Sequence, residues 1–298
     1  MARSSAPGTA FLLGEHAVVY GEPALLFAVG RRATVTVEST EEDDMPDSAY
    51  VREAVGRARE HARAHEHAGD ETPLRVDVES DIPIGAGLGS SAAVSAATLH
   101  AASRELGVPM EREKVAEEAH AVELDVQGAA SPADTYTTTM GGYTVVGDEE
   151  KRSLDVSGGA NARFVVGWDG GSAPTGEMVE GVSRLVESNP VAADIVETVG
   201  DLSRRGVERA EEGDTEALGA LMDMNQGLLD ALGVSSSSLS RMVWAARDAG
   251  GNAKLTGAGG AGCAVAYPAT DEVLNAVAEE AEDTFVVGVA EGVRSEEE

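Results

Sequence analysis

The sequence predicts an α+β protein of two domains, each with its own mixture of helices and strands. Three observations lead to this prediction. Strand-like and helix-like apolar patterns occur in both halves of the chain. A charged, glycine-containing stretch at residues 148–161 separates the halves. Hydrophobic residues make up 42% of the 298 residues, enough for a sizeable core. We therefore expect one domain at residues 1–158 and a second at residues 159–298.

The first half is predicted to combine short strands with longer helices. A glycine-rich loop at residues 82–91 follows a half-buried strand and precedes an alanine-rich helix that runs to about Leu106. Residues 128–134 form a loop of small residues, and the threonine-rich residues 136–146 are expected to be strand and turn. The half-buried strand is 74–78, and strands are also predicted at 24–29 and 33–37, after a short apolar stretch at 10–13. The other predicted helices are 49–67 and 111–126, and residues 40–47 form an acidic break.

The second half restarts with a buried strand at residues 164–167. Two further strands, at 253–256 and 262–266, flank a glycine-rich turn, and the chain ends in a strand at 284–289 and a frayed acidic tail at 295–298. The predicted helices of this half are 176–187, 192–212, 215–231, 239–249 and 271–282.

The charge balance excludes several classes of partner. The 22 basic and 53 acidic residues give a net charge of −31, and no basic cluster is present, so we expect neither nucleic acid nor an anionic membrane as a partner. The apolar content and regular patterning argue against a disordered acidic chain. An acid-rich folded surface fits a protein that works in concentrated salt, which screens repulsion between carboxylates.

The expected location is the cytoplasm. Cys263 is the single cysteine, so an intrachain disulfide cannot form, as is usual in a reducing compartment. The first 14 residues lack the pattern of a signal peptide, and the apolar runs are shorter than the roughly 20 residues that a membrane span needs.

The glycine-rich loop predicts a phosphate-binding site. Gly85, Gly87 and Gly89 alternate directly before a helix, where glycines allow close approach of a ligand and the helix start offers free N–H groups. Ser90 and Ser91 add hydroxyls that could cap the helix or bind Mg²⁺. The spacing matches neither the P-loop nor the dinucleotide fingerprint. The alternative is a plain connection between a strand and a helix.

Three motifs along the chain resemble those of the GHMP kinases. Residues 83–93 resemble the second motif of that superfamily, residues 254–263 the third, and residues 6–8 with 14–21 the first. The resemblance covers almost the whole chain. It implies an ATP-dependent small-molecule kinase with a two-domain fold, in which an N-terminal domain like domain 2 of ribosomal protein S5 precedes a ferredoxin-like domain.

Within this superfamily, residues 14–21 and 126–134 resemble the archaeal type of mevalonate kinase. The resemblance implies ATP-dependent phosphorylation of (R)-mevalonate to 5-phosphomevalonate, with ATP and Mg²⁺ as cofactors, and leaves a homodimer open. It assigns catalysis to Asp134, Mg²⁺ binding to Ser91 and Glu123, and substrate binding to Glu15, His16, Asp134, Thr256, Gly257 and Ala258. It assigns ATP to Pro83, Gly85, Ala86, Gly87, Leu88, Gly89, Ser90 and Ser91.

Four of the assigned side chains also have a purely structural interpretation. Asp134 lies among small residues, where an aspartate often only forms a turn. Glu123 belongs to an acid-rich helix whose other carboxylates are solvated. His16 could be a hydrogen-bonded structural histidine, and Thr256 could belong to a hairpin turn.

The first motif departs from the family pattern at Thr9, where mevalonate kinases usually have lysine. The third motif has Ala261 where glycine is usual. Loss of one electrostatic donor can lower a rate by a factor on the order of 10²–10³. Asp134 and Mg²⁺ could suffice with Thr9 as a hydrogen-bond donor, Lys254 could supply the charge, or the chemistry could differ. Thr9 therefore keeps two alternatives open: a mevalonate 3-kinase or diphosphomevalonate decarboxylase-like enzyme, and a metabolite-binding protein with impaired catalysis.

Overall fold

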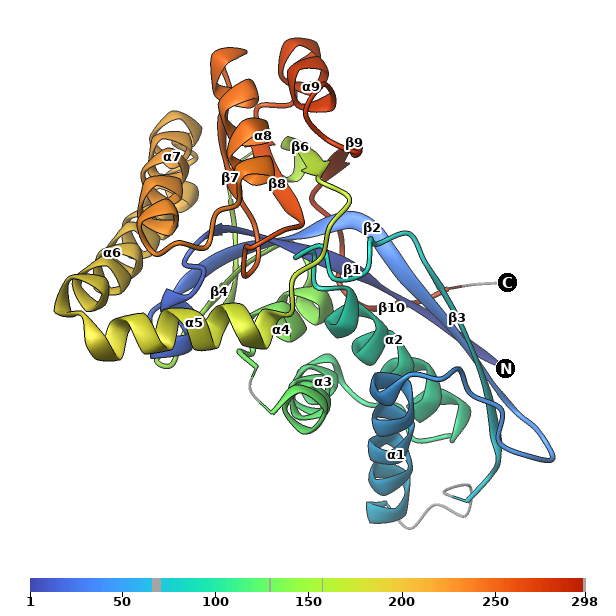
Figure 1. Cartoon of the computed structure of the whole chain (residues 1–298). Helices are drawn as coiled ribbons and strands as arrows, with labels where there is room; N and C mark the ends of the chain where they lie inside the picture. The colour runs from blue at the N-terminus through green and yellow to red at the C-terminus, as the bar shows by residue number, and fades with distance from the viewer. Residues whose placement is uncertain (66–70, 129, 157, 297–298) are drawn as a thin grey trace.

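The chain folds around two antiparallel sheets with helices against them (Figure 1). The computed structural model describes residues 1–65, 71–128, 130–156 and 158–296. The predicted α+β class is confirmed, because each sheet is formed largely by one half of the chain and has its own helices. Within the described residues, we find no helix whose length and apolar character would suit a bilayer crossing.

The first sheet has six strands, and the two longest form its centre. The predicted strands at residues 24–29 and 33–37 are one strand, because Gly30 and Arg31 form a bulge opposite the step from Pro7 to Gly8. The strand order is β10-β1-β2-β4-β5, with β3 also paired to β2. The strands are β1 (Ala2–Leu13), β2 (Ala24–Ser39), β3 (Leu74–Ser80), β4 (Tyr143–Val146), β5 (Lys151–Leu154) and β10 (Arg294–Ser295).

The helices of the first half lie together on one side of this sheet (Figure 1). The alanine-rich helix α2 packs directly against β1 and β2, because its small side chains allow a close approach. Of the predicted helix 49–67, residues 66 and 67 lie outside the described part of the chain. The helices are α1 (Ala49–Ala64), α2 (Ser90–Glu105), α3 (Arg112–Gln127) and α4 (Ala133–Met140), and a 3-10 helix, η1 (Ala17–Tyr20), lies within the first motif.

The prediction of strand and turn at residues 136–146 was wrong for residues 136–140, which belong to helix α4. The Thr137 hydroxyl donates to the Ala133 carbonyl at 2.8 Å, and the Thr139 hydroxyl donates to the Thr135 carbonyl at 2.7 Å. These bonds satisfy the buried hydroxyls inside the helix, so tertiary burial overrides the weak helix propensity of threonine. Only residues 143–146 form the expected strand, β4.

The second sheet has the order β7-β8-β6-β9. Helices α8 and α9 pack against it, and α6 and α7 reach back to the first sheet. Its strands are β6 (Arg163–Trp168), β7 (Asn252–Leu255), β8 (Cys263–Tyr267) and β9 (Asp283–Gly288). The helices of this half are α5 (Thr175–Ser188), α6 (Pro190–Glu212), α7 (Thr215–Ala231), α8 (Ser237–Asp248) and α9 (Asp271–Ala278), preceded by a 3-10 turn, η2 (Gly159–Asn161).

The end of the chain crosses back to the first sheet. Ser295 pairs with Ser4 in β1, and the Glu296 N–H donates to the Arg3 carbonyl at 2.9 Å, so the prediction of a frayed tail was wrong for residues 295 and 296. Residues 297 and 298 lie outside the described part. The boundary between residues 158 and 159 stays a prediction. The core continues across it, because the ring of Phe27 stacks on that of Phe164 with centroids 4.3 Å apart.

Candidate active site

The glycine-rich loop has the backbone that its sequence requires. Gly85, Gly87 and Gly89 have φ angles of 69°, 78° and 63°, which L side chains rarely adopt. Gly89 is the N-cap of α2, so the first N–H groups of this helix are free to bind an anion. All the residues assigned to ATP lie on this loop or in the first turn of α2.

The first and third motifs contact the loop from two sides. The Thr9 N–H donates to the Leu88 carbonyl at 3.0 Å, and the Cys263 N–H donates to the Ala86 carbonyl at 3.0 Å. A Cβ atom added at Gly87 would lie 2.6 Å from the Thr256 carbonyl oxygen, so glycine is needed for this approach. The three sequence motifs therefore meet at one place.

Asp134 lies at this junction, in the first turn of α4. The hydroxyl of the buried Thr9 donates to Asp134 Oδ1. A Cβ atom at Gly89 would lie 3.3 Å from the same oxygen, so the carboxylate faces the start of α2. Burial raises the pKa of Asp134, the bond from Thr9 lowers it, and the charge of Glu15 raises it. The site thus holds a carboxylate of raised basicity beside the glycine-rich loop.

Ser91 and Glu123 form a second pair on neighbouring helices. Ser91 Oγ donates to Glu123 Oε1 at 2.7 Å, and Glu123 is 5% exposed. Burial, followed by the charge of Asp134, raises the pKa of Glu123 to about 7, although the bond from Ser91 opposes this. Burial and the Glu123 charge also raise the pKa of the neighbouring Tyr50 hydroxyl.

The Ser91–Glu123 pair fits a Mg²⁺ ion in its chemistry. Both side chains offer oxygen, which this hard cation prefers, and the carboxylate is buried with no cation against it in the described structure. No cluster of three or more His, Cys, Asp or Glu side chains suited to a metal occurs among the described residues. The protein would therefore supply one carboxylate and one hydroxyl, and phosphates and water would complete the shell.

The turn that carries Glu15 and His16 is held from the second half of the chain. His16 has a φ of 61°, and its Nε2–H donates to the Ala258 carbonyl at 3.0 Å. Burial lowers the pKa of His16, so the neutral ring is favoured. Glu15 Oε2 accepts from Asn225 Nδ2 at 2.9 Å, and Glu15 Oε1 pairs with Lys254.

The structure places the remaining predicted residues on the turn between β7 and β8. Thr256 Oγ1 accepts from the Phe11 N–H at 2.8 Å, which joins this turn to the first motif. Gly257 lies against Gly87 of the loop. Lys254 is fully buried and also donates to the Leu255 carbonyl at 2.6 Å, so its charge is committed to Glu15 rather than free beside Thr9.

Three side chains near the site were missed at the level of sequence. Asn225 binds Glu15, and Tyr50 adjoins Ser91 and Glu123. Asp169 accepts from the Gly262 N–H at 2.9 Å and from the Ser238 hydroxyl at 2.6 Å, which fixes the turn of the third motif. None of the three belongs to a motif, so only their spatial neighbours identify them.

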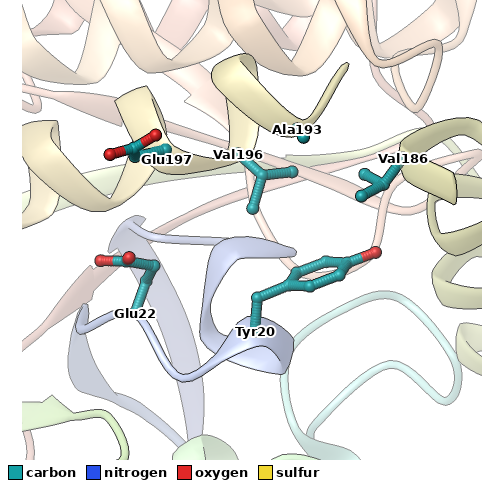
Figure 2. A pocket seen from close by; sticks show the side chains of 6 residues that line it. All are labelled: Tyr20, Glu22, Val186, Ala193, Val196 and Glu197. Atoms are coloured by element: carbon teal, nitrogen blue, oxygen red, sulfur yellow. The ribbon is translucent and has the colours of Figure 1, made fainter. Parts of the chain in front are cut away.

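A cavity of about 280 Å³ lies beside this site, between η1 and the helices α5 and α6. Figure 2 shows the carboxylates of Glu22 and Glu197 on one side and the Tyr20 ring reaching toward Val186. No predicted site residue lines it. No residue of the glycine-rich loop lines this cavity, so the junction of the three motifs is the better candidate for a phosphate site.

Comparison with known proteins agrees with this geometry. The family model of the GHMP kinases N terminal domain matches residues 49–142, and that of the GHMP kinases C terminal domain matches residues 207–285. The mevalonate kinase of Methanothermobacter thermautotrophicus is 39% identical over 284 residues, which cover 92% of this chain and 93% of the relative. The chain belongs to the mevalonate kinases of the GHMP kinase superfamily.

A second relative and two solved structures extend the match. The mevalonate kinase of Pyrococcus abyssi is 37% identical, with 99% of this chain and 97% of the relative covered. The fold resembles that of the Methanococcus jannaschii mevalonate kinase, with a TM-score of 0.81, 24% identity, and 97% and 98% of the two chains covered. It also resembles L. major mevalonate kinase in complex with R-mevalonate, with a TM-score of 0.80, 22% identity, and 98% and 96% covered. This member of the mevalonate kinases is an ATP-dependent small-molecule kinase with the two-domain GHMP kinase fold, as predicted.

Proposed function

We propose that the protein transfers the γ-phosphoryl group of ATP to the 5-hydroxyl of (R)-mevalonate, giving 5-phosphomevalonate and ADP. The names of the relatives support mevalonate as the acceptor. One observation carries the choice of site: the Asp134 carboxylate, oriented by Thr9, faces the start of α2 at the glycine-rich loop.

Each predicted residue has a role in this proposal. The loop and the first turn of α2 bind the phosphates of ATP through backbone N–H groups. The turn at Glu15 and His16, together with Thr256, Gly257 and Ala258, receives mevalonate. Phosphoryl transfer depends mainly on positioning and on stabilising charge.

Asp134 would act as the general base. The 5-oxygen of mevalonate forms a bond to the γ-phosphorus while the bond from that phosphorus to the bridging oxygen of ADP breaks, and the hydroxyl proton passes to Asp134. The raised pKa of Asp134 favours this acceptance of a proton. Thr9 donates to one carboxylate oxygen and leaves the other for the substrate.

Mg²⁺, bound by Ser91 and Glu123, would neutralise negative charge on the phosphate oxygens. The buried carboxylate without a counter-cation supports this assignment. Location in the cytoplasm and assembly as a homodimer stay predictions.

Phosphorus NMR of the reaction product tests the proposal. The protein is incubated with (R)-mevalonate, ATP and Mg²⁺ in molar KCl, and the position of the new phosphate is assigned. Phosphate on the 5-oxygen supports the proposal, whereas a product phosphorylated only on the 3-oxygen contradicts it.

Thr9 favours a second candidate, a mevalonate 3-kinase or diphosphomevalonate decarboxylase-like enzyme, because such enzymes also lack the lysine of the first motif. The same assay with diphosphomevalonate as substrate distinguishes this candidate from a binding protein without catalysis. The names of the relatives favour the 5-kinase.

A further inference from the structure

The Glu15 carboxylate is held by two side chains from the second half of the chain. Lys254, on β7, pairs with Oε1, and Asn225, on α7, donates from Nδ2 to Oε2 at 2.9 Å. All three side chains are at most 2% exposed. The substrate-side turn of the first motif is therefore fixed by a buried polar cluster, Glu15–Lys254–Asn225, that spans the two halves.

Stability alone is a poor explanation for this cluster. Burial of both charges removes them from water, and apolar side chains of similar volume often replace a buried ion pair without loss of stability. Asn225 Oδ1 is buried and has no hydrogen-bond partner among the described residues, which is a further cost. Residues that lower stability in this way are expected at functional sites.

The cluster determines where the neighbouring His16 lies. His16 follows Glu15 directly and has a left-handed backbone with a φ of 61°, which the surrounding structure must maintain. Its Nε2–H donates to the carbonyl of Ala258, four residues after Lys254 in the sequence. Glu15 and His16 are thus anchored to the same strand–turn segment.

We propose that Asn225 and Lys254 are positioning residues that hold the Glu15–His16 turn in the geometry that binds the acceptor alcohol. This inference rests on the proposed function, since it takes that turn as the mevalonate side of the site. Among the described residues, neither side chain forms a hydrogen bond or an ion pair with the glycine-rich loop. Their loss should therefore weaken binding of the acceptor and spare ATP.

The variant Asn225→Leu tests this inference, because leucine has a similar volume but no amide. We expect the KM for mevalonate to rise roughly tenfold, the effect of losing a hydrogen bond to a charged group, with the KM for ATP within about twofold. Isothermal titration of mevalonate without ATP should show the same loss of affinity. If Asn225→Leu does not fold, Asn225→Ser is measured with the same expected outcomes.

Gln226→Leu is the matched control. Gln226 is the next residue on α7, is 1% exposed, and binds the Leu255 N–H, Asp230 and Ser235 rather than the first motif. We expect this variant to lower the melting temperature at least as much as Asn225→Leu, without a selective change in the KM for mevalonate.

The outcomes separate the two proposals. If the unmodified protein does not phosphorylate mevalonate, the proposed function fails, and the positioning role fails with it. If the unmodified protein is active but Asn225→Leu keeps its KM for mevalonate, only the positioning role is overturned. Equal changes in both KM values, shared by Gln226→Leu, would likewise overturn it in favour of a general structural role.

Discussion

Thr9 gives Asp134 an environment that a lysine would not. A hydroxyl donates one hydrogen bond without adding positive charge, so burial and the Glu15 charge still raise the pKa of the carboxylate. A lysine ammonium at the same position would favour the ionised form and lower that pKa. Threonine in place of lysine thus removes a positive charge from the site but leaves the Asp134 carboxylate a stronger base. A stronger base is suited to accept the proton of the substrate hydroxyl.

The variant Asp134→Asn should lower kcat by a factor of about 10²–10⁴, the usual contribution of a general base. Asparagine keeps the shape and can still accept from Thr9, so we expect ATP to bind with unchanged affinity. Steady-state kinetics and calorimetric titration of ATP check the two parts. Near-normal turnover in this variant would show that another group accepts the proton.

The raised pKa of Glu123 predicts that the stabilisation of the protein by Mg²⁺ depends on pH. Its pKa in the folded protein is about 7, against an ordinary value of 4.5, so its contribution to stability is present below pH 4.5 and is lost as the pH rises through about 7. Mg²⁺ binds the ionised form. Adding Mg²⁺ with a non-hydrolysable ATP analogue should therefore raise the melting temperature more at pH 8 than at pH 6.

Glu123→Gln is the control for this measurement, because its amide does not titrate. The gain in melting temperature should be smaller in this variant and equal at the two pH values. A pH dependence that persists in Glu123→Gln would assign the effect to another group.

At the scale of elements, the glycine-rich loop was predictable and α4 was not. Glycines that alternate before a helix indicate a left-handed backbone from the local sequence alone. The structure has this backbone at Gly85, Gly87 and Gly89, directly before α2. The local sequence of the threonines in α4 favours a strand. Their helical hydrogen bonds depend on burial by residues distant in sequence, such as Pro7, whose carbonyl accepts from the Thr138 hydroxyl. The contact of Glu15 with Asn225 could not be predicted either, because the two residues lie 210 positions apart in the sequence.

The loop itself offers a test at Gly89. A Cβ atom there would overlap the Thr9 hydroxyl and strain a backbone with a φ of 63°. Gly89→Ala should lower the free energy of unfolding by about 1–2 kcal/mol from the left-handed backbone. It should also lower kcat by at least about tenfold, because Asp134 and the helix start would shift. Urea unfolding and kinetics at saturating substrate measure the two effects.

Gly233→Ala isolates the backbone contribution. Gly233 has a φ of 77° at the end of α7, with no atom within 4 Å of an added Cβ. This control should lose similar stability and keep its kcat. If Gly89→Ala also keeps its kcat, the close approach of the loop to Thr9 is not required for catalysis.

For the whole molecule, the charge of −31 predicts stability that depends on salt. Raising KCl from about 0.1 M to about 2 M shortens the Debye length from roughly 10 Å to less than about 3 Å, which screens repulsion among surface carboxylates. We expect the melting temperature to rise by several degrees. Calorimetry in KCl and in sucrose separates screening from preferential exclusion, because sucrose carries no charge. A melting temperature independent of KCl would contradict the prediction.

The return of the chain end to the first sheet has a consequence for synthesis. The outer edge of β1 is paired by residues 294 and 295, and the C-terminal end of α4 is met by Val293, whose N–H donates to the Thr139 carbonyl at 3.1 Å. A ribosome makes these residues after the other strands of both sheets, which precede them in the sequence. While the second half is still being translated, the nascent first sheet therefore has an open strand edge, of the kind that other chains can join. The charged side chains of this acid-rich chain would oppose such association until the last strand closes the edge.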